Sequence, residues 1–159
     1  GLGDVYKRQE FKRLVSSKYN TTSMDDLQEN DIVLAKEERE LRIENYVVYY
    51  PVNYYKIGDE FLSKLDTMMM SLYEFPDARL QIHSHASSTS TSSYNMKLSI
   101  KRMNELVNFF VLKGIPKDRI SYRAYGESKL LNSCGDDEDC EDAMHQINRR
   151  TELRIITQN

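Results

Sequence analysis

The segment from Leu80 to Arg102 changes its hydrophobic period partway along, and this change constrains the fold more than any other feature of the sequence. Leu80 and Ile82 alternate with polar residues, which is typical of a half-buried strand. A loop of serines and threonines follows over residues 87–93. Beyond it the apolar residues recur with a helical period, at Met103, Leu106, Val107, Phe110 and Val111. Polar loops between a strand and a helix often form binding sites, and a helix N-terminus favours an anion.

The rest of the chain predicts three more strands and one more helix. We expect strands over residues 45–52, 119–125 and 151–156, and a helix over residues 59–73. Gly114, with Pro116 just after it, should end the helix that follows the serine-rich loop. The fold class is therefore α+β, a two-layer sandwich with two helices on one face of a mixed four-stranded sheet, in the order β-α-β-α-β-β. Right-handed crossovers should make the first three strands parallel, while the last strand can run antiparallel.

Length and charge limit the classes of protein to which the chain can belong. Its 159 residues suit one domain, and a net charge of -3 argues against a nucleic-acid-binding protein. We place the domain at residues 44–159 and treat residues 1–43 as an N-terminal extension or linker. Residues 1–9 differ in character from the rest and are set aside as artefactual sequence. No signal peptide is apparent, so we expect the chain to be a piece of a longer protein.

Two cysteines, Cys134 and Cys140, flank a short acidic segment in the long loop over residues 126–142. A disulfide across this segment is favoured over free thiols, which would place the chain in an oxidising compartment. Two thiols alone do not complete a zinc site.

Catalytic and metal-binding alternatives find little support in the sequence. His83 and His85 share a strand face and could form a metal triad with His145, but no carboxylate follows them closely. The acidic run over residues 136–142 lacks the spacing of a calcium-binding loop, so a solvated loop is the better interpretation. The serine-rich loop has no nucleophile elbow. We expect no metal, no cofactor and no enzymatic activity.

Five short motifs occur in an order and spacing that resemble the OmpA-like domain, the family of the OmpA C-terminal domain, MotB and the peptidoglycan-associated lipoprotein. The motifs are Ser84-His85-Ala86-Ser87, Tyr94-Asn95 with Leu98, Ser99 and Arg102, Gly114-Ile115 with Arg119-Ile120, Tyr125-Gly126-Glu127-Ser128, and Asn148-Arg149-Arg150-Thr151-Glu152. The resemblance covers roughly residues 44–157. The insert between Cys134 and Cys140 resembles the Bacteroidetes branch of the family.

This resemblance implies a periplasmic, non-catalytic module that binds peptidoglycan and anchors an outer-membrane protein to the cell wall. The expected ligand is the diaminopimelate residue of the stem peptide, and other envelope proteins are possible partners. Arg102 matches the family arginine that binds the ligand carboxylate, and we expect it near the start of its helix. Asn95, Asn148 and Arg149 match further positions around the site, although Arg149 and Arg150 should point to opposite faces.

The sequence departs from the family at both acidic positions of the pocket. Ser87 stands where the family has an aspartate that binds the ligand amine, and Tyr50-Pro51 aligns with a Phe-Asp pair. At Ser87, a ligand ammonium would therefore meet a hydroxyl rather than a carboxylate. Loss of one charge-assisted hydrogen bond costs about 1.5–3 kcal/mol. The alternative hypothesis is a degenerate OmpA-like domain with a structural or protein-interaction role in an envelope complex.

Overall fold

The computed structural model describes residues 45–157, so the predicted extension of residues 1–43 lies outside the described part. Its elements are β1 (Asn45–Tyr49), α3 (Asp59–Glu74), β2 (Ala78–Ser84), α4 (Ser92–Leu112), the 3-10 turn η2 (Lys117–Arg119), β3 (Ile120–Ala124), α5 (Asp142–Gln146) and β4 (Arg150–Thr157). The α+β class and the predicted order of the main elements are confirmed. No helix in this part of the chain has the length and apolar character needed to cross a bilayer.

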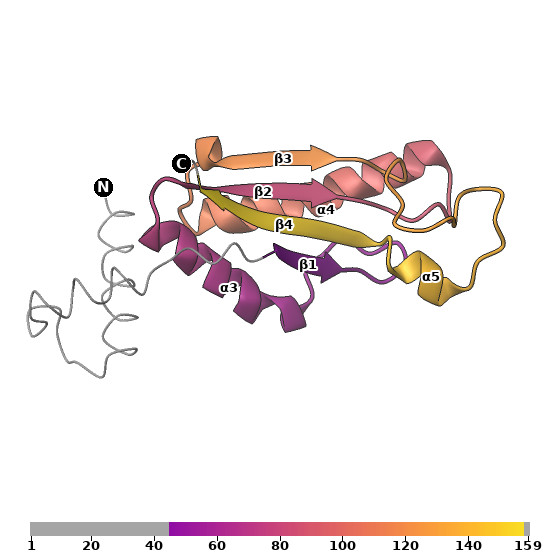
Figure 1. Cartoon of the computed structure of the whole chain (residues 1–159), viewed down its shortest axis with the longest axis horizontal. Helices are drawn as coiled ribbons and strands as arrows, with labels where there is room; N and C mark the ends of the chain where they lie inside the picture. The colour runs from indigo at the N-terminus through magenta and orange to yellow at the C-terminus, as the bar shows by residue number, and fades with distance from the viewer. Residues whose placement is uncertain (1–44, 158–159) are drawn as a thin grey trace, which may run out of the picture.

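The four strands form one mixed sheet in the order β1-β4-β2-β3, as Figure 1 shows. Strands β2 and β3 pair in parallel, whereas β4 pairs antiparallel with both β1 and β2. The first three strands therefore run in one direction, as expected. The last strand of the chain lies between the first two, which gives β4 two hydrogen-bonded neighbours.

One hydrophobic core joins both long helices to the sheet. Alternation along β2 buries Leu80 and Ile82, and alternation along β4 buries Leu153 and Ile155 in the same core. From the helices, the core receives side chains at helical spacing: Leu65, Met68, Met69, Leu72, Leu106, Val107 and Phe110. Figure 1 shows α4 running alongside β2 and β3, with α3 near β1.

Several element boundaries differ from the prediction for local reasons. Strand β1 ends at Tyr49 rather than Val52, because Pro51 has no N–H for the ladder and the chain turns through Asn53 with a φ of 59°. Helix α4 begins at Ser92, where the side chain of Thr91 accepts from the Tyr94 N–H as an N-cap. Gly114 has a φ of 98°, which confirms it as the helix terminator. The short helix α5 was not predicted.

Candidate anion-binding site

The polar motifs meet at one end of the sheet because of its pairing register. Tyr49 pairs with Arg150, and Ser84 pairs with both Thr151 and Ala124. The segments that follow β1, β2 and β3 and precede β4 therefore share one edge. Helix α4 starts from the same edge, so motifs that are far apart in the sequence form one site.

Arg102 lies at the centre of this site and is completely buried, with 0% of its surface exposed. Its Nε donates to the Tyr54 carbonyl at 2.8 Å and its Nη1 to the His85 carbonyl at 2.9 Å. Its Nη2 has no hydrogen-bond partner among the described residues. The expectation that Arg102 lies near the helix start is wrong. It occupies the middle of the 21-residue helix α4, too far from the N-terminus to share in that positive potential.

The ring of the buried Tyr50 packs against the face of the Arg102 guanidinium. The Arg102 Cζ lies 4.5 Å from the centre of the Tyr50 ring, within the range of a cation–π contact. The Tyr50 hydroxyl donates to Thr151 Oγ1 at 3.1 Å, and Thr151 shares a further hydrogen bond with Ser84. Burial raises the pKa of Tyr50 to about 12, so the hydroxyl stays neutral at physiological pH.

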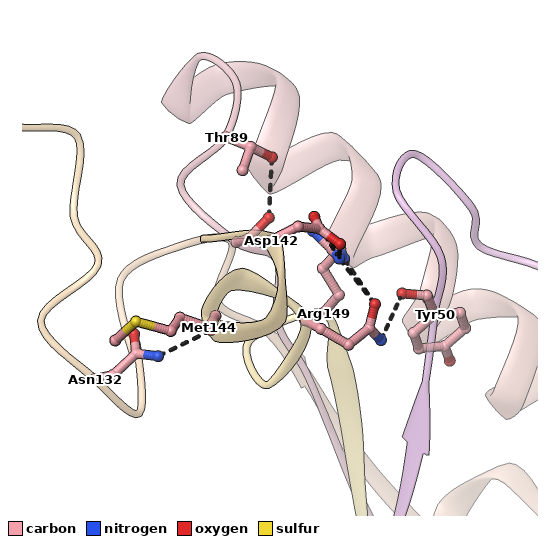
Figure 2. A network of polar contacts seen from close by, with 8 residues as sticks. Tyr50, Thr89, Asn132, Asp142, Met144 and Arg149 are labelled. Atoms are coloured by element: carbon pink, nitrogen blue, oxygen red, sulfur yellow. Dashed lines mark hydrogen bonds and ion pairs between the residues drawn. The ribbon is translucent and has the colours of Figure 1, made fainter. Parts of the chain in front are cut away.

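Arg149 is a second buried arginine at this edge, with 2% of its surface exposed. Its Nη2 donates to Asp142 Oδ1 at 2.9 Å and to Gln146 Oε1 at 2.8 Å, both from the short helix α5. Figure 2 shows Arg149 between Asp142 and Tyr50. Gln146 also donates to the Tyr50 carbonyl at 3.1 Å, which ties α5 to the end of β1. The Nη1 of Arg149 has no partner in the described part of the chain.

The two arginines influence each other electrostatically. Burial is the main cause that lowers the pKa of Arg102 to about 10, and the positive charge of Arg149 acts in the same direction. Arg102 still carries its charge at neutral pH, yet its two hydrogen bonds go to uncharged carbonyls. A buried cation without a carboxylate partner is costly unless an anion completes its hydrogen bonds. Arg102 is therefore the group of this site that lacks a compensating negative charge among the described residues.

Arg150 points away from Arg149, as alternation predicts. Its Nε donates to Glu152 Oε1 at 2.9 Å, and its Nη2 approaches the Lys129 carbonyl at 3.4 Å. Arg150 therefore pairs with an acid on the opposite side and does not join Arg102.

Ser87 and Asn95 lie in the loop and the first turn that lead to Arg102. Ser87 is buried, and its hydroxyl shares a 3.0 Å hydrogen bond with Thr89. Asn95 Nδ2 donates to the Ser90 carbonyl at 2.9 Å and also to the carboxylate of Glu127. The amide of Asn95 therefore holds the serine-rich loop against the segment after β3.

Asn148 uses both ends of its buried amide to hold the long loop. Its Oδ1 accepts from the Leu131 N–H at 2.8 Å, and its Nδ2 donates to Asn132 Oδ1 at 2.9 Å. Asn132 also donates to the Met144 carbonyl at 2.9 Å, as Figure 2 shows. The amide of Asn148 thus joins the start of β4 to the loop.

The predicted disulfide between Cys134 and Cys140 is present, with a Cα–Cα distance of 5.9 Å. Cys134 is buried, and its carbonyl accepts a hydrogen bond from Ser88. The disulfide-closed segment therefore docks on the serine-rich loop. In Figure 2, Thr89 of that loop lies beside Asp142.

His83 and His85 both pack on the aromatic ring of Tyr125. His85 stacks on Tyr125 with ring centres 5.1 Å apart, and His83 meets the same ring edge-on at 5.2 Å. Burial lowers the pKa of His85 to about 4, and the charge of Arg150 adds to this effect. Within residues 45–157, no group of three histidine, cysteine or acidic side chains could hold a metal ion.

Of the five predicted ligand-binding residues, Arg102 and Arg149 are both buried, and the charge of Arg149 acts on Arg102. Ser87, Asn95 and Asn148 surround the same edge, with their side chains engaged in the contacts described above. Sequence reasoning missed the contributions of Tyr50, Asp142 and Gln146. The spacing of Asp142 and Gln146 at i and i+4 was the available signal, since it places both on one side of a short helix, and Arg149 follows soon after that helix ends.

Residues 49–143 match the sequence model of the OmpA family. The chain is 34% identical over 80 residues to outer membrane protein A of Serratia marcescens, a match that covers 49% of this chain. The matched region spans only 22% of that relative's length.

Solved structures show the same fold. The peptidoglycan-associated lipoprotein of Burkholderia pseudomallei superposes with a TM-score of 0.63 at 22% identity, covering 69% of this chain and 89% of that one. The cell wall anchor of the type VI secretion system of Pseudomonas aeruginosa superposes with a TM-score of 0.56 at 16% identity, covering 80% and 94% of the two chains.

Proposed function

Because the chain belongs to the OmpA family, we propose that its domain binds the stem peptide of peptidoglycan without catalysis and anchors a longer outer-membrane protein to the cell wall. The proposed ligand group is a carboxylate of diaminopimelate. The proposed location is the periplasm, where a disulfide persists. Residues 44–159 form the binding domain in this proposal, and residues 1–43 are an N-terminal extension or linker.

One observation carries the proposal: Arg102 is a fully buried guanidinium with a free Nη2 and only carbonyl partners among the described residues. A carboxylate would accept from Nη2 and neutralise the charge, as guanidinium–carboxylate pairs do elsewhere. The relatives support the choice of ligand, since one is named for its association with peptidoglycan and another as a cell wall anchor.

The other predicted residues have distinct parts in this proposal. Arg149 Nη1 provides a second donor for the anion, while Ser87 and Asn95 line the approach from the serine-rich loop. Asn148 acts by holding the neighbouring loop in place. The loop closed by Cys134 and Cys140 supports assignment to the Bacteroidetes branch.

Sedimentation with purified peptidoglycan sacculi tests the proposal. The wild-type domain should pellet with sacculi, and Arg102→Met should stay in the supernatant because it keeps the length of the side chain but removes its charge. Arg154→Ala is the matched control, because Arg154 is an exposed arginine that bonds Asn45 at the other end of the sheet. Circular dichroism should show that both variants are folded. Wild-type protein that remains soluble beside sacculi would contradict the proposal.

The second candidate is a degenerate domain with a structural or protein-interaction role in an envelope complex. The neutral side chains of Ser87 and Pro51, in place of the acids expected there, favour it. If wild type fails to pellet while Ser87→Asp pellets with sacculi, the degenerate domain is the better description.

A further inference from the structure

The end of the sheet where the polar motifs meet holds two buried guanidinium groups, those of Arg102 and Arg149. The acidic side chains near them already accept hydrogen bonds from other residues. Asp142 is bonded by Arg149, and the Glu127 carboxylate is bonded by Asn95. Ser87, buried in the loop between β2 and α4, offers only a neutral hydroxyl that already bonds Thr89. The site therefore has positive charge for an anion and, among the described residues, no carboxylate on Arg102.

This imbalance acts against ligands that carry an ammonium group beside the carboxylate. An ammonium brought to this edge loses its water and meets the positive charge of Arg102, which no carboxylate among the described residues offsets, whereas Arg149 is already paired with Asp142. A hydroxyl such as that of Ser87 replaces only part of the lost hydration. An acylated nitrogen carries no charge, so it avoids this repulsion while leaving the carboxylate free to bind.

We infer that the site selects carboxylates whose neighbouring nitrogen is acylated or absent over carboxylates with a free ammonium group. In the cell wall, this class is diaminopimelate whose side-chain amine is already joined to another peptide in a cross-link. The inference rests on the proposed function and adds the chemical class of the ligand. A domain with this preference anchors to mature, cross-linked wall rather than to uncross-linked stem peptides.

Glu127 is the acid that could bind a ligand ammonium and so reverse the inferred preference. Its position argues against that role. Glu127 is held by Asn95, which lies seven residues before Arg102 on α4. At about 1.5 Å per helical residue this separation is roughly 10 Å along the axis. Asn95 and Arg102 are therefore two turns apart along α4, and the Glu127 carboxylate is already bonded by an amide.

Calorimetric titration with three small dicarboxylates tests the inference. The probes are pimelate, diaminopimelate and N,N′-diacetyl-diaminopimelate, which share one carbon chain and differ at the nitrogens. We expect the acetylated compound and pimelate each to bind wild type at least threefold more tightly than diaminopimelate. Ser87→Asp should shift the ratio toward diaminopimelate by about tenfold or more, since it adds a charged acceptor. Ser90→Asp, an exposed change in the same loop, should leave the ratio unchanged.

The outcomes separate this inference from the proposed function. A wild-type domain that binds diaminopimelate as tightly as the acetylated compound, or more tightly, overturns the selectivity but leaves wall binding intact. If wild type binds diaminopimelate more tightly and Glu127→Gln loses this preference for diaminopimelate, Glu127 is the ammonium acceptor. Failure of all three compounds, with sacculi still bound, overturns the inference alone. Failure of sacculi as well overturns both.

Discussion

The guanidinium carbon of Arg102 lies 4.5 Å from the centre of the ring of Tyr50, the residue that directly follows β1. Two backbone carbonyls fix the edge of the guanidinium, and the ring supports its face. These contacts hold a rotamer-rich side chain in one position before any ligand arrives. Preorganisation of this kind reduces the entropic cost of binding.

Changes at Tyr50 should separate the role of the ring from that of the hydroxyl. Tyr50→Phe keeps the ring under Arg102 but removes the hydrogen bond to Thr151, so we expect a loss of about 1 kcal/mol in the free energy of unfolding and normal binding of sacculi. Tyr50→Leu removes the cation–π contact, which contributes about 0.5–2 kcal/mol, and should also weaken binding several-fold. Urea titration and sacculus sedimentation measure the two effects. Equal binding by both variants would show that the ring does not position Arg102.

The main elements could be predicted because their patterns depend on local periodicity. Alternation in β2 and β4 and the helical stripe of α4 all bury apolar residues in one core, and the structure has them at nearly the expected positions. The place of β4 between β1 and β2 could not be derived this way, since strand order depends on packing across the whole sheet. The resemblance to a known family supplied Arg102, which periodicity alone would have left as one polar residue on a helix.

The surroundings of the site were harder to predict because they depend on a long loop. Arg149 was expected near the ligand, but its contact with Asp142 requires the short helix α5. A helix of this length has almost no intrinsic stability, so its sequence carries a weak signal. The contact of Ser88 with Cys134 likewise joins two loops with no shared periodicity.

Gly126 should be intolerant of a side chain because of its backbone and its neighbours. Its φ of +57° is left-handed, and an added Cβ would lie 3.2 Å from the Met96 backbone. We expect Gly126→Ala to lower the free energy of unfolding by about 1–2 kcal/mol or more, measured by urea titration. Gly135→Ala is the control, since nothing lies within 4 Å of its Cβ position. Similar losses in both variants would contradict this reasoning.

Removal of the Asn148 amide should loosen the long loop. Asn148→Ala leaves the Leu131 N–H and the Asn132 side chain without these partners, and buried unsatisfied groups cost about 1–3 kcal/mol. Limited proteolysis should then cleave the segment between residues 127 and 141 faster than in wild type. Asn104→Ala, an exposed change on α4, should behave like wild type. Unchanged cleavage in Asn148→Ala would show that the disulfide alone orders the loop.

Reduction of the disulfide should affect both stability and binding. Replacing Cys134 and Cys140 by alanine opens a loop with a sequence separation of 6, which by chain entropy costs about 2 kcal/mol. Because Ser88 donates to the Cys134 carbonyl, the serine-rich loop should also become less ordered and bind sacculi more weakly. Ser88→Ala, with the disulfide intact, isolates the second effect. Full binding by the double variant would show that the loop does not depend on the disulfide.

His85 should make the domain less stable in mild acid. Its pKa is lowered from 6.5 to about 4 in the folded protein, chiefly by burial, so the unfolded chain binds the proton more tightly. The stabilising contribution is therefore complete above pH 6.5 and is lost as the pH falls through 6.5 toward 4, by up to about 3 kcal/mol. His85→Phe can keep the stacking on Tyr125 without a titrating group. Urea titrations at pH 7 and pH 4.5 should show a larger loss for wild type than for His85→Phe, and equal losses would assign the acid sensitivity to carboxylates elsewhere.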